Sequence, residues 1–201
     1  MYRIMHKEID NLRIQYIQLD MENTQYAPLS CLFNNNFDFI SQCNDVKLLY
    51  DILNFIPIHD TKNAVKKAQE YVGRLDCTYW KDKCIEHCCK HIDVLEAFYS
   101  SLKRNDVLTG ILFYGNAMKG LLEIAYLAEG TPYPTEKWIW KGLEKVNKKM
   151  FNDINAKMVG KLPKTCEDMR NNILYITSLI CSVLKEKDLV PVYIIDDLLH
   201  P

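Results

Sequence analysis

The sequence lacks the features that mark several common functional classes. Lys and Arg number 25 and Asp and Glu number 26, so there is no basic excess of the kind that a general nucleic-acid-binding surface needs. No apolar run reaches the roughly 18 residues that indicate a membrane span. The first 11 residues contain no apolar segment typical of a signal peptide. We therefore expect neither membrane insertion nor general nucleic-acid binding.

Several catalytic motifs are also missing. The glycine patterns of phosphate-binding loops and dinucleotide sites are absent, and so is the nucleophile elbow of α/β-hydrolases. No Asp-x-Asp pair is present that could hold two magnesium ions from one strand. These absences exclude the common signatures of nucleotide-binding and hydrolytic enzymes.

The eight cysteines do not have the spacing of an extracellular disulfide framework. Without a visible signal peptide, this predicts reduced thiols and a cytoplasmic protein. One group, Cys84, His87, Cys88 and His91, has zinc-ligating side chains at helical spacing. The alternative is that Cys84 and Cys88 lie on the apolar face of a helix, since free cysteine is among the most buried residue types. We favour core thiols over a metal site because one helix rarely supplies four tetrahedral ligands.

The first 55 residues differ in pattern from the rest. Alternating β-forming side chains and short apolar runs predict strands at 3–9, 12–19 and 46–50, and a short helix within 27–42. Asp10 and Asn11 are expected to form the turn between the first two strands. Because two or three strands make a poor sheet alone, residues 1–55 look like the edge of an α+β domain whose other strands lie elsewhere.

From residue 60 onward the spacing of apolar residues is helical. Start and stop signals predict helices at about 61–75, 78–102, 106–129, 135–149 and 165–185, followed by a short tail at 192–201. The clearest signals are an N-cap at Asn105 or Asp106, a capping box at Thr165 and Asp168, and a left-handed stop at Gly130. The predicted fold class is mainly α with a small α+β N-terminal part. A four- to five-helix bundle over residues 56–201 follows two or three β-strands within residues 1–55.

The helix predicted at 106–129 carries an apolar and a polar stripe. The apolar stripe is Val107, Ile111, Tyr114, Met118, Leu121 and Ala125, and the polar stripe is Asn116, Lys119, Glu123 and Tyr126. One interpretation is that such a polar stripe orients a substrate and exchanges protons with it. The other is that it is a solvated helix face with one Lys–Glu pair. Periodicity alone favours the solvated face. The three glycines of this helix, Gly110, Gly115 and Gly120, weigh for the first interpretation. Each costs about 1 kcal/mol relative to alanine, and such glycines often permit close approach of a ligand or another segment.

A proline-locked turn follows this helix. After Thr131-Pro132-Tyr133-Pro134, a helix capped by Thr135 carries Lys137 and Trp138 in its first turn. The helix dipole and the ammonium group of Lys137 both favour an anion at this point. The alternative is a plain turn in which Trp138 fills the core. Taken with the polar stripe, the turn predicts a ligand cleft between the 106–129 helix and residues 133–138.

Residues 115–140 resemble the helical C-terminal domain of bacterial nucleotidyltransferases of the polymerase-beta-like superfamily, which are related to aminoglycoside nucleotidyltransferases. The matching pattern is a long helix of small and apolar residues, then Tyr133-Pro134, then Lys137-Trp138. Upstream, residues 12–51 resemble the last part of the catalytic domain. The Gly-Ser motif and the paired carboxylates with which such enzymes bind magnesium and a nucleoside triphosphate have no match in this sequence.

The resemblance implies transfer of a nucleoside monophosphate from a nucleoside triphosphate, such as ATP, to a hydroxyl acceptor. This chain would supply the acceptor-binding domain, with Glu123 as catalytic base or acceptor contact and with Asn116, Lys119, Tyr126, Tyr133, Lys137 and Trp138 as acceptor-binding residues. Magnesium and the nucleotide are implied for the complete enzyme, whose catalytic domain would act in cis or in trans, and neither is expected on this chain alone. The competing hypothesis is a non-catalytic helical binding module, such as one half of a toxin–antitoxin-type pair.

Overall fold

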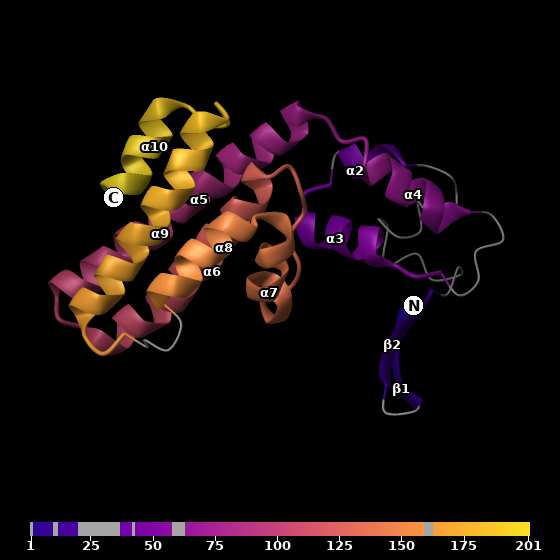
Figure 1. The fold of residues 1–201 in the computed structure, drawn as a ribbon, viewed down its shortest axis with the longest axis horizontal. Coiled ribbons are helices and arrows are strands. Elements are labelled where there is room, and N and C mark those ends of the chain that lie inside the picture. The colour runs from indigo at the N-terminus through magenta and orange to yellow at the C-terminus, as the bar shows by residue number, and fades with distance from the viewer. Residues whose placement is uncertain (1, 10–11, 20–36, 42, 58–62, 159–162) are drawn as a thin grey trace. The chain divides into compact units, whose positions relative to one another are not determined.

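The computed structural model describes residues 2–9, 12–19, 37–41, 43–57, 63–158 and 163–201 (Figure 1). The chain divides into two compact units, one within residues 1–44 and 52–74 and the other within 45–51 and 75–201. The described part is mainly helical, which confirms the predicted fold class at that level. None of the helices in the described ranges combines the length and the apolar character needed to cross a membrane.

The smaller unit contains a β-hairpin and short helices. Strands β1 (Tyr2–Ile9) and β2 (Leu12–Leu19) pair antiparallel, with Ile9 opposite Leu12. The turn predicted at Asp10 and Asn11 lies outside the described residues. Helix α2 (Asp38–Ser41) lies inside the range predicted as helical, most of which falls outside the described residues. Helix α4 (Ala64–Val72) follows, and the stretch in which its predicted start lies is also outside them.

The side chain of Gln69 on α4 satisfies backbone carbonyls at the end of helix α3. Its amide nitrogen donates hydrogen bonds to the carbonyl oxygens of Ile52 (3.1 Å) and Phe55 (2.9 Å). The last carbonyls of a helix have no partner within it, so these bonds stabilise the helix end. The rings of Phe37 and Tyr71 stack in the same unit with their centroids 4.9 Å apart.

Residues 46–50, predicted as a strand, belong to helix α3 (Val46–Asn54). The apolar residues Val46, Leu49 and Ile52 recur every three positions, and all three are buried. The Asp45 carboxylate accepts a hydrogen bond from the backbone N–H of Lys47 (3.1 Å), which favours a helix start. The strand prediction is wrong because a window of five residues is too short to reveal a helical period.

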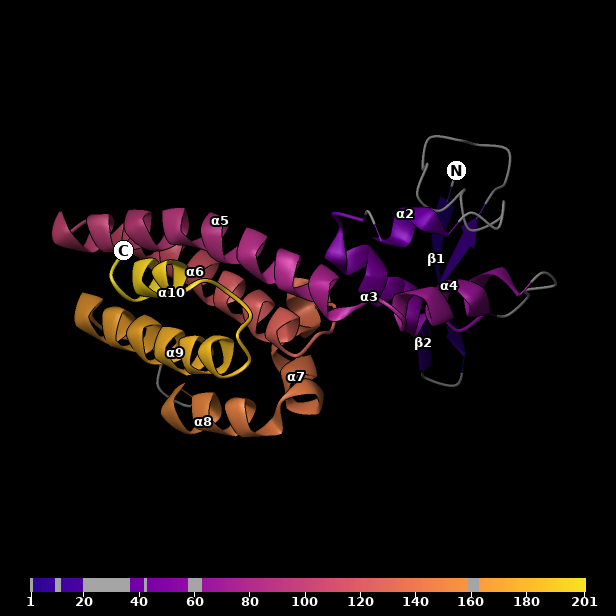
Figure 2. The same ribbon diagram turned by 90° about the horizontal axis from the view of Figure 1, so that it is seen from above.

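Helices α5 (Cys77–Lys103) and α6 (Val107–Ala128) form a long antiparallel hairpin (Figures 1 and 2). The Asp76 side chain accepts from the N–H of Tyr79 (2.9 Å) and caps α5. The Asp106 side chain accepts from the N–H of Thr109 (3.1 Å) and caps α6 at one of the two predicted positions. Gly130 follows α6 with a φ of 65°, the predicted left-handed stop.

The chain continues with helices α7 (Glu136–Val146), α8 (Lys148–Met158), α9 (Cys166–Glu186) and α10 (Val192–Leu199). Helix α9 packs along α6, and α10 folds back onto α9 and α5 (Figure 2). The predicted capping box is confirmed, because the Asp168 N–H donates to the Thr165 hydroxyl and the Thr165 N–H to the Asp168 carboxylate, both at 3.0 Å. Two predictions are wrong: the single helix at 135–149 is two helices, α7 and the start of α8, and the tail at 192–201 is mostly helix α10.

The core of the larger unit lies where α5, α6 and α9 meet. Its fully buried side chains include Leu95, Phe98, Leu121, Ile124 and Ile176. The apolar stripe predicted for α6 is therefore correct in the second half of the helix.

In the first half of α6, two residues predicted for the core are exposed: Val107 by 51% and Ile111 by 54%. The buried residue of these turns is Gly110, where an added Cβ would lie 3.0 Å from the Leu102 side chain. A glycine was not expected to define the packing face, so the predicted stripe is displaced here.

Candidate functional site

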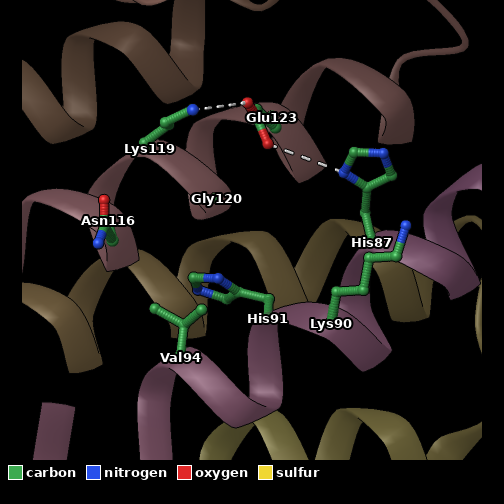
Figure 3. Close-up of a pocket in the computed structure, with 8 residues that line it drawn as sticks. All are labelled: His87, Lys90, His91, Val94, Asn116, Lys119, Gly120 and Glu123. Atoms are coloured by element: carbon green, nitrogen blue, oxygen red, sulfur yellow. Dashed lines mark ion pairs between the residues drawn. The ribbon is translucent and has the colours of Figure 1, made fainter. Parts of the chain in front are cut away.

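A cleft of about 250 Å³ lies between α5 and α6 (Figure 3). Its residues recur at spacings of three and four along each helix, so each set occupies one helical face. The lining residues are His87, Lys90, His91 and Val94 from α5, and Asn116, Lys119, Gly120 and Glu123 from α6. The cleft is thus the place where the polar stripe of α6 faces α5.

Gly120 permits a close approach of the two helices at this cleft. A Cβ added there would lie 2.8 Å from Cε1 of His91 and closer still to its Nδ1. The imidazole of His91 therefore occupies the space that a side chain at position 120 would need, and it is only 3% exposed. This contact explains why the helix retains a glycine there despite its poor helix propensity.

The carboxylate of Glu123 lies between a cation and an imidazole. Its Oε1 is 4.0 Å from Nζ of Lys119, and its Oε2 is 3.8 Å from Nδ1 of His87 (Figure 3). The side chain is 13% exposed, and burial raises its pKa although Lys119 opposes the shift. A carboxylate with a raised pKa is a better proton acceptor near neutral pH.

Lys119 also connects the cleft to the first turn of α7. Its Nζ lies 2.7 Å from Oε1 of Glu136, which accepts a second hydrogen bond from Nζ of Lys47 at 2.8 Å. These two hydrogen bonds lower the pKa of Glu136 to about 2, and the bond to Glu136 raises the pKa of Lys119. Lys47, Glu136, Lys119 and Glu123 thus form a row of alternating charges.

Both histidines of the cleft have lowered pKa values, so they are neutral at pH 7. Burial lowers the pKa of His87, whose Nε2 lies 3.4 Å from the Tyr133 hydroxyl. Burial also lowers the pKa of His91, to about 4. Within the part of the chain that the structure describes, Nε2 of His91 has no hydrogen-bond partner. A buried polar atom left in this state costs about 1–3 kcal/mol.

Comparison with known proteins adds a structural likeness. No protein-family model matches the chain, and no curated protein matches it. A solved structure does. It is a nucleotidyltransferase-like protein from Exiguobacterium sibiricum, 11% identical, with a TM-score of 0.49 over 94% of this chain. The chain spans 60% of the length of that protein.

The structure brings three of the predicted site residues together, because Asn116, Lys119 and Glu123 all line the cleft. Tyr133 does not line the cleft but contacts His87, which does, with the two rings edge-to-face at a centroid distance of 5.5 Å. The sequence predicted that residues 133–138 would form the second wall of the cleft. That prediction is wrong, because the second wall is α5.

Lys137 and Trp138 are exposed on α7 and are not among the residues that line the cleft. The ammonium of Lys137 lies 5.3 Å from the centroid of the Trp138 ring. Trp138 is 50% exposed, so it does not fill the core either. These two residues and the lining residues of the cleft therefore occupy different places in the larger unit.

Tyr126 belongs to the core rather than to the polar stripe. It is 1% exposed, and its hydroxyl donates a hydrogen bond to the carbonyl oxygen of Ile139 (2.8 Å). Its side chain reaches α7, and it is not among the residues that line the cleft. Its role in the structure is to hold α7 against α6.

The sequence did not indicate that His87 and His91 would line a ligand cleft. Cys84 and Cys88 are fully buried, as the core interpretation expects, and burial raises the pKa of Cys84 to about 12. The two thiols face the core while the two imidazoles face the cleft. Among the described residues, no group of three or more His, Cys, Asp or Glu side chains is placed to hold a metal ion. The sequence signal that would have indicated this face of α5 is the recurrence of His87, His91 and Val94 at spacings of four and three.

Proposed function

We propose that this chain binds the hydroxyl acceptor of a nucleotidyltransferase and that Glu123 receives the proton of the attacking hydroxyl. The observation that carries this proposal is the shielded carboxylate of Glu123 in the cleft, between Lys119 and His87. Burial raises the pKa of Glu123, as a general base requires. The resemblance of residues 115–140 to the helical domain of nucleotidyltransferases supports the same assignment.

In the proposed reaction the acceptor oxygen attacks the α-phosphorus of a nucleoside triphosphate. A bond forms between them, pyrophosphate leaves, and the acceptor proton passes to Glu123. Lys119 opposes the effect of burial and so favours the ionised carboxylate that can take the proton. The described residues contain no cluster that fits a magnesium ion. We therefore assign the metal and the nucleotide to a catalytic domain acting in cis or in trans.

A transfer assay tests this proposal. Extract from cells in which the gene is deleted supplies the acceptor and any separate catalytic domain, and α-³²P-labelled nucleoside triphosphates with magnesium supply the donor. We expect no labelled product from the pure chain and, for a catalytic domain that acts in trans, a labelled small molecule when chain and extract are combined.

Two isosteric variants complete the assay. Glu123→Gln removes the base and should lower labelling roughly 100-fold or more. Glu167→Gln, at an exposed position of α9, should leave labelling within about twofold, because it lies outside the cleft and surface changes have small effects. Robust labelling by the pure chain, or labelling that does not depend on Glu123, would contradict the proposal.

A second candidate function, the non-catalytic binding module, is favoured by one observation. Val107, Leu108, Ile111 and Leu112 are between 51% and 72% exposed on the first two turns of α6. Contiguous exposed apolar side chains of this kind commonly mark a protein-interaction surface. This function predicts no labelled product in the transfer assay and a stable complex that Leu108→Lys with Leu112→Lys weakens.

A further inference from the structure

The charged groups that line the cleft are paired with opposite charges, which bears on the kind of ligand that fits it. The groups that act electrostatically on its lining residues are four lysines and three carboxylates: Lys47, Lys83, Lys90, Lys119, Glu86, Glu123 and Glu136. The two lining lysines are already paired, Lys119 with Glu136 at 2.7 Å and Lys90 with Glu86 at 2.6 Å. An anionic ligand would have to displace one of these carboxylates.

A cationic ligand meets the opposite obstacle. The carboxylate of Glu123 is the acidic group that lines the cleft, and it already lies near the ammonium of Lys119. Glu86 accepts hydrogen bonds from both Lys83 (2.8 Å) and Lys90. A ligand ammonium group would therefore compete with a lysine at each carboxylate, and it would also lie close to the lysines themselves.

The uncharged polar groups of the cleft fit hydroxyls. His91 is neutral, and its Nε2 lacks a partner among the described residues. The exposed amide of Asn116 offers donors and an acceptor on the facing helix. A hydroxyl both donates and accepts, so it pairs with either tautomer of His91 and with either end of the Asn116 amide.

The volume of the cleft limits the size of the ligand that it can bind. Its volume of about 250 Å³ is below the roughly 300–1,000 Å³ of pockets that hold drug-sized ligands. A single sugar ring or a short polyol is therefore the appropriate size. Nε2 of His91 is shielded from solvent in the free protein, so a ligand in the cleft reaches it only when the imidazole rotates. The hydrogen bond gained by this unpartnered nitrogen favours that rotation.

We propose that the cleft between α5 and α6 binds an uncharged polyhydroxyl compound the size of one sugar ring, with one hydroxyl on His91 and another facing Glu123. The proposal rests on the proposed function, and it narrows the acceptor to neutral sugars and polyols. Polycationic and phosphorylated acceptors are disfavoured because every charged group that lines the cleft already has a counterion within 4.0 Å.

Three matched probes test the ligand class on the chain alone: glucose, glucosamine and glucose 6-phosphate. They share one ring and differ in a single neutral, cationic or anionic group. Titrations followed by amide chemical shifts should show glucose binding at least about fivefold more tightly than either charged probe, with shifts at His91 and Asn116. Tighter binding of a charged probe, shifts elsewhere, or binding of none of the three would overturn the proposal.

Variants separate the contact from folding. His91→Phe keeps a ring against Gly120 and removes the nitrogen, so glucose affinity should fall roughly fivefold or more, the value of a neutral hydrogen bond. Asn116→Ala changes an exposed residue and should weaken glucose binding in the same direction if the first variant folds poorly. Unchanged affinity in both variants would overturn the contact.

The outcomes distinguish this inference from the proposed function. Glucose binding without any extract-dependent transfer would support the ligand class and overturn the transferase assignment. Transfer that depends on Glu123 but labels an acceptor that is itself cationic or phosphorylated would support the transferase assignment and overturn the ligand class.

Discussion

At His91, one imidazole closes the contact between α5 and α6 and also lines the cleft. Its ring packs against Gly120, and its Nε2 has no partner among the described residues. Burial lowers its pKa from the ordinary 6.5 to about 4. The folded protein therefore keeps this ring neutral over a pH range in which the unfolded chain protonates it.

This difference predicts that stability falls as the pH falls from about 6.5 toward 4. In that window the unfolded state binds more protons at His91 and His87 than the folded state does. The free energy of unfolding should decrease between pH 7 and pH 5. His91→Phe should reduce this decrease by roughly 1–2 kcal/mol, as measured by urea unfolding followed by circular dichroism.

Two points make the measurement specific. Glu123, whose pKa burial raises, contributes with the opposite sign just above pH 4.5, but it is present in both proteins and cancels in the difference. His200→Gln replaces an exposed histidine outside the cleft and serves as the matched control variant. An equal slope in His91→Phe and wild type would show that His91 is not the group responsible.

At the residue scale, the sequence predicted the polar cleft residues of α6 but not those of α5. Asn116, Lys119 and Glu123 could be found because one helix carries all three at regular spacing. His87 and His91 were missed because the core cysteines lie at neighbouring positions of the same helix, and their apolar face dominated the pattern. Lys47 was missed because its contact with Glu136 joins residues 89 positions apart.

Within α6, three glycines recur every five residues, but their surroundings differ. Gly120 faces His91, Gly110 faces Leu102, and nothing lies within 4 Å of a Cβ added at Gly115. The close approach expected of helix glycines therefore holds at two positions and not at the third. At Gly115 only the intrinsic helix cost of glycine remains.

A pair of alanine substitutions should separate these effects. Gly115→Ala should raise the free energy of unfolding by roughly 0.5–1 kcal/mol through helix propensity. Gly120→Ala gains the same term but forces His91 to move, so it should lower stability by about 1–3 kcal/mol. Urea unfolding at pH 7 measures both. Equal stabilisation by the two variants would mean that His91 adapts without cost.

Three element boundaries were predictable from local sequence signals. The caps at Asp106, Thr165 and Gly130 appear as predicted. The start of α3 has a cap at Asp45, but the short run after it looked like a strand. The break between α7 and α8 at Asn147 could not be predicted, because neither glycine nor proline occurs there.

Across the whole molecule, the described thiols divide between core and surface. Cys84, Cys88 and Cys181 are buried, while Cys77 and Cys89 are exposed. Burial raises the pKa of Cys84 to about 12 and that of Cys181 to about 11. Thiolate is the reactive form, so the buried group should be inert in the folded protein.

A thiol reagent at pH 8 should therefore modify Cys77 and Cys89 rapidly and Cys84, Cys88 and Cys181 only after unfolding, as mapped by peptide mass spectrometry. The same interpretation predicts no stoichiometric zinc in protein purified without added metal. One zinc per chain, lost when His87 and His91 are replaced by alanine, would contradict it and restore the metal site.

The contact between Tyr126 and α7 links two positions that are far apart in the sequence. The Tyr126 hydroxyl donates to the carbonyl oxygen of Ile139 and touches the place where a Cβ on Gly142 would stand. A side chain at position 142 therefore fits only if the hydroxyl at position 126 is removed. In diverging relatives these two positions should therefore covary. Tyrosine at position 126 should occur with glycine at 142, and phenylalanine or a smaller residue at 126 should occur with alanine at 142.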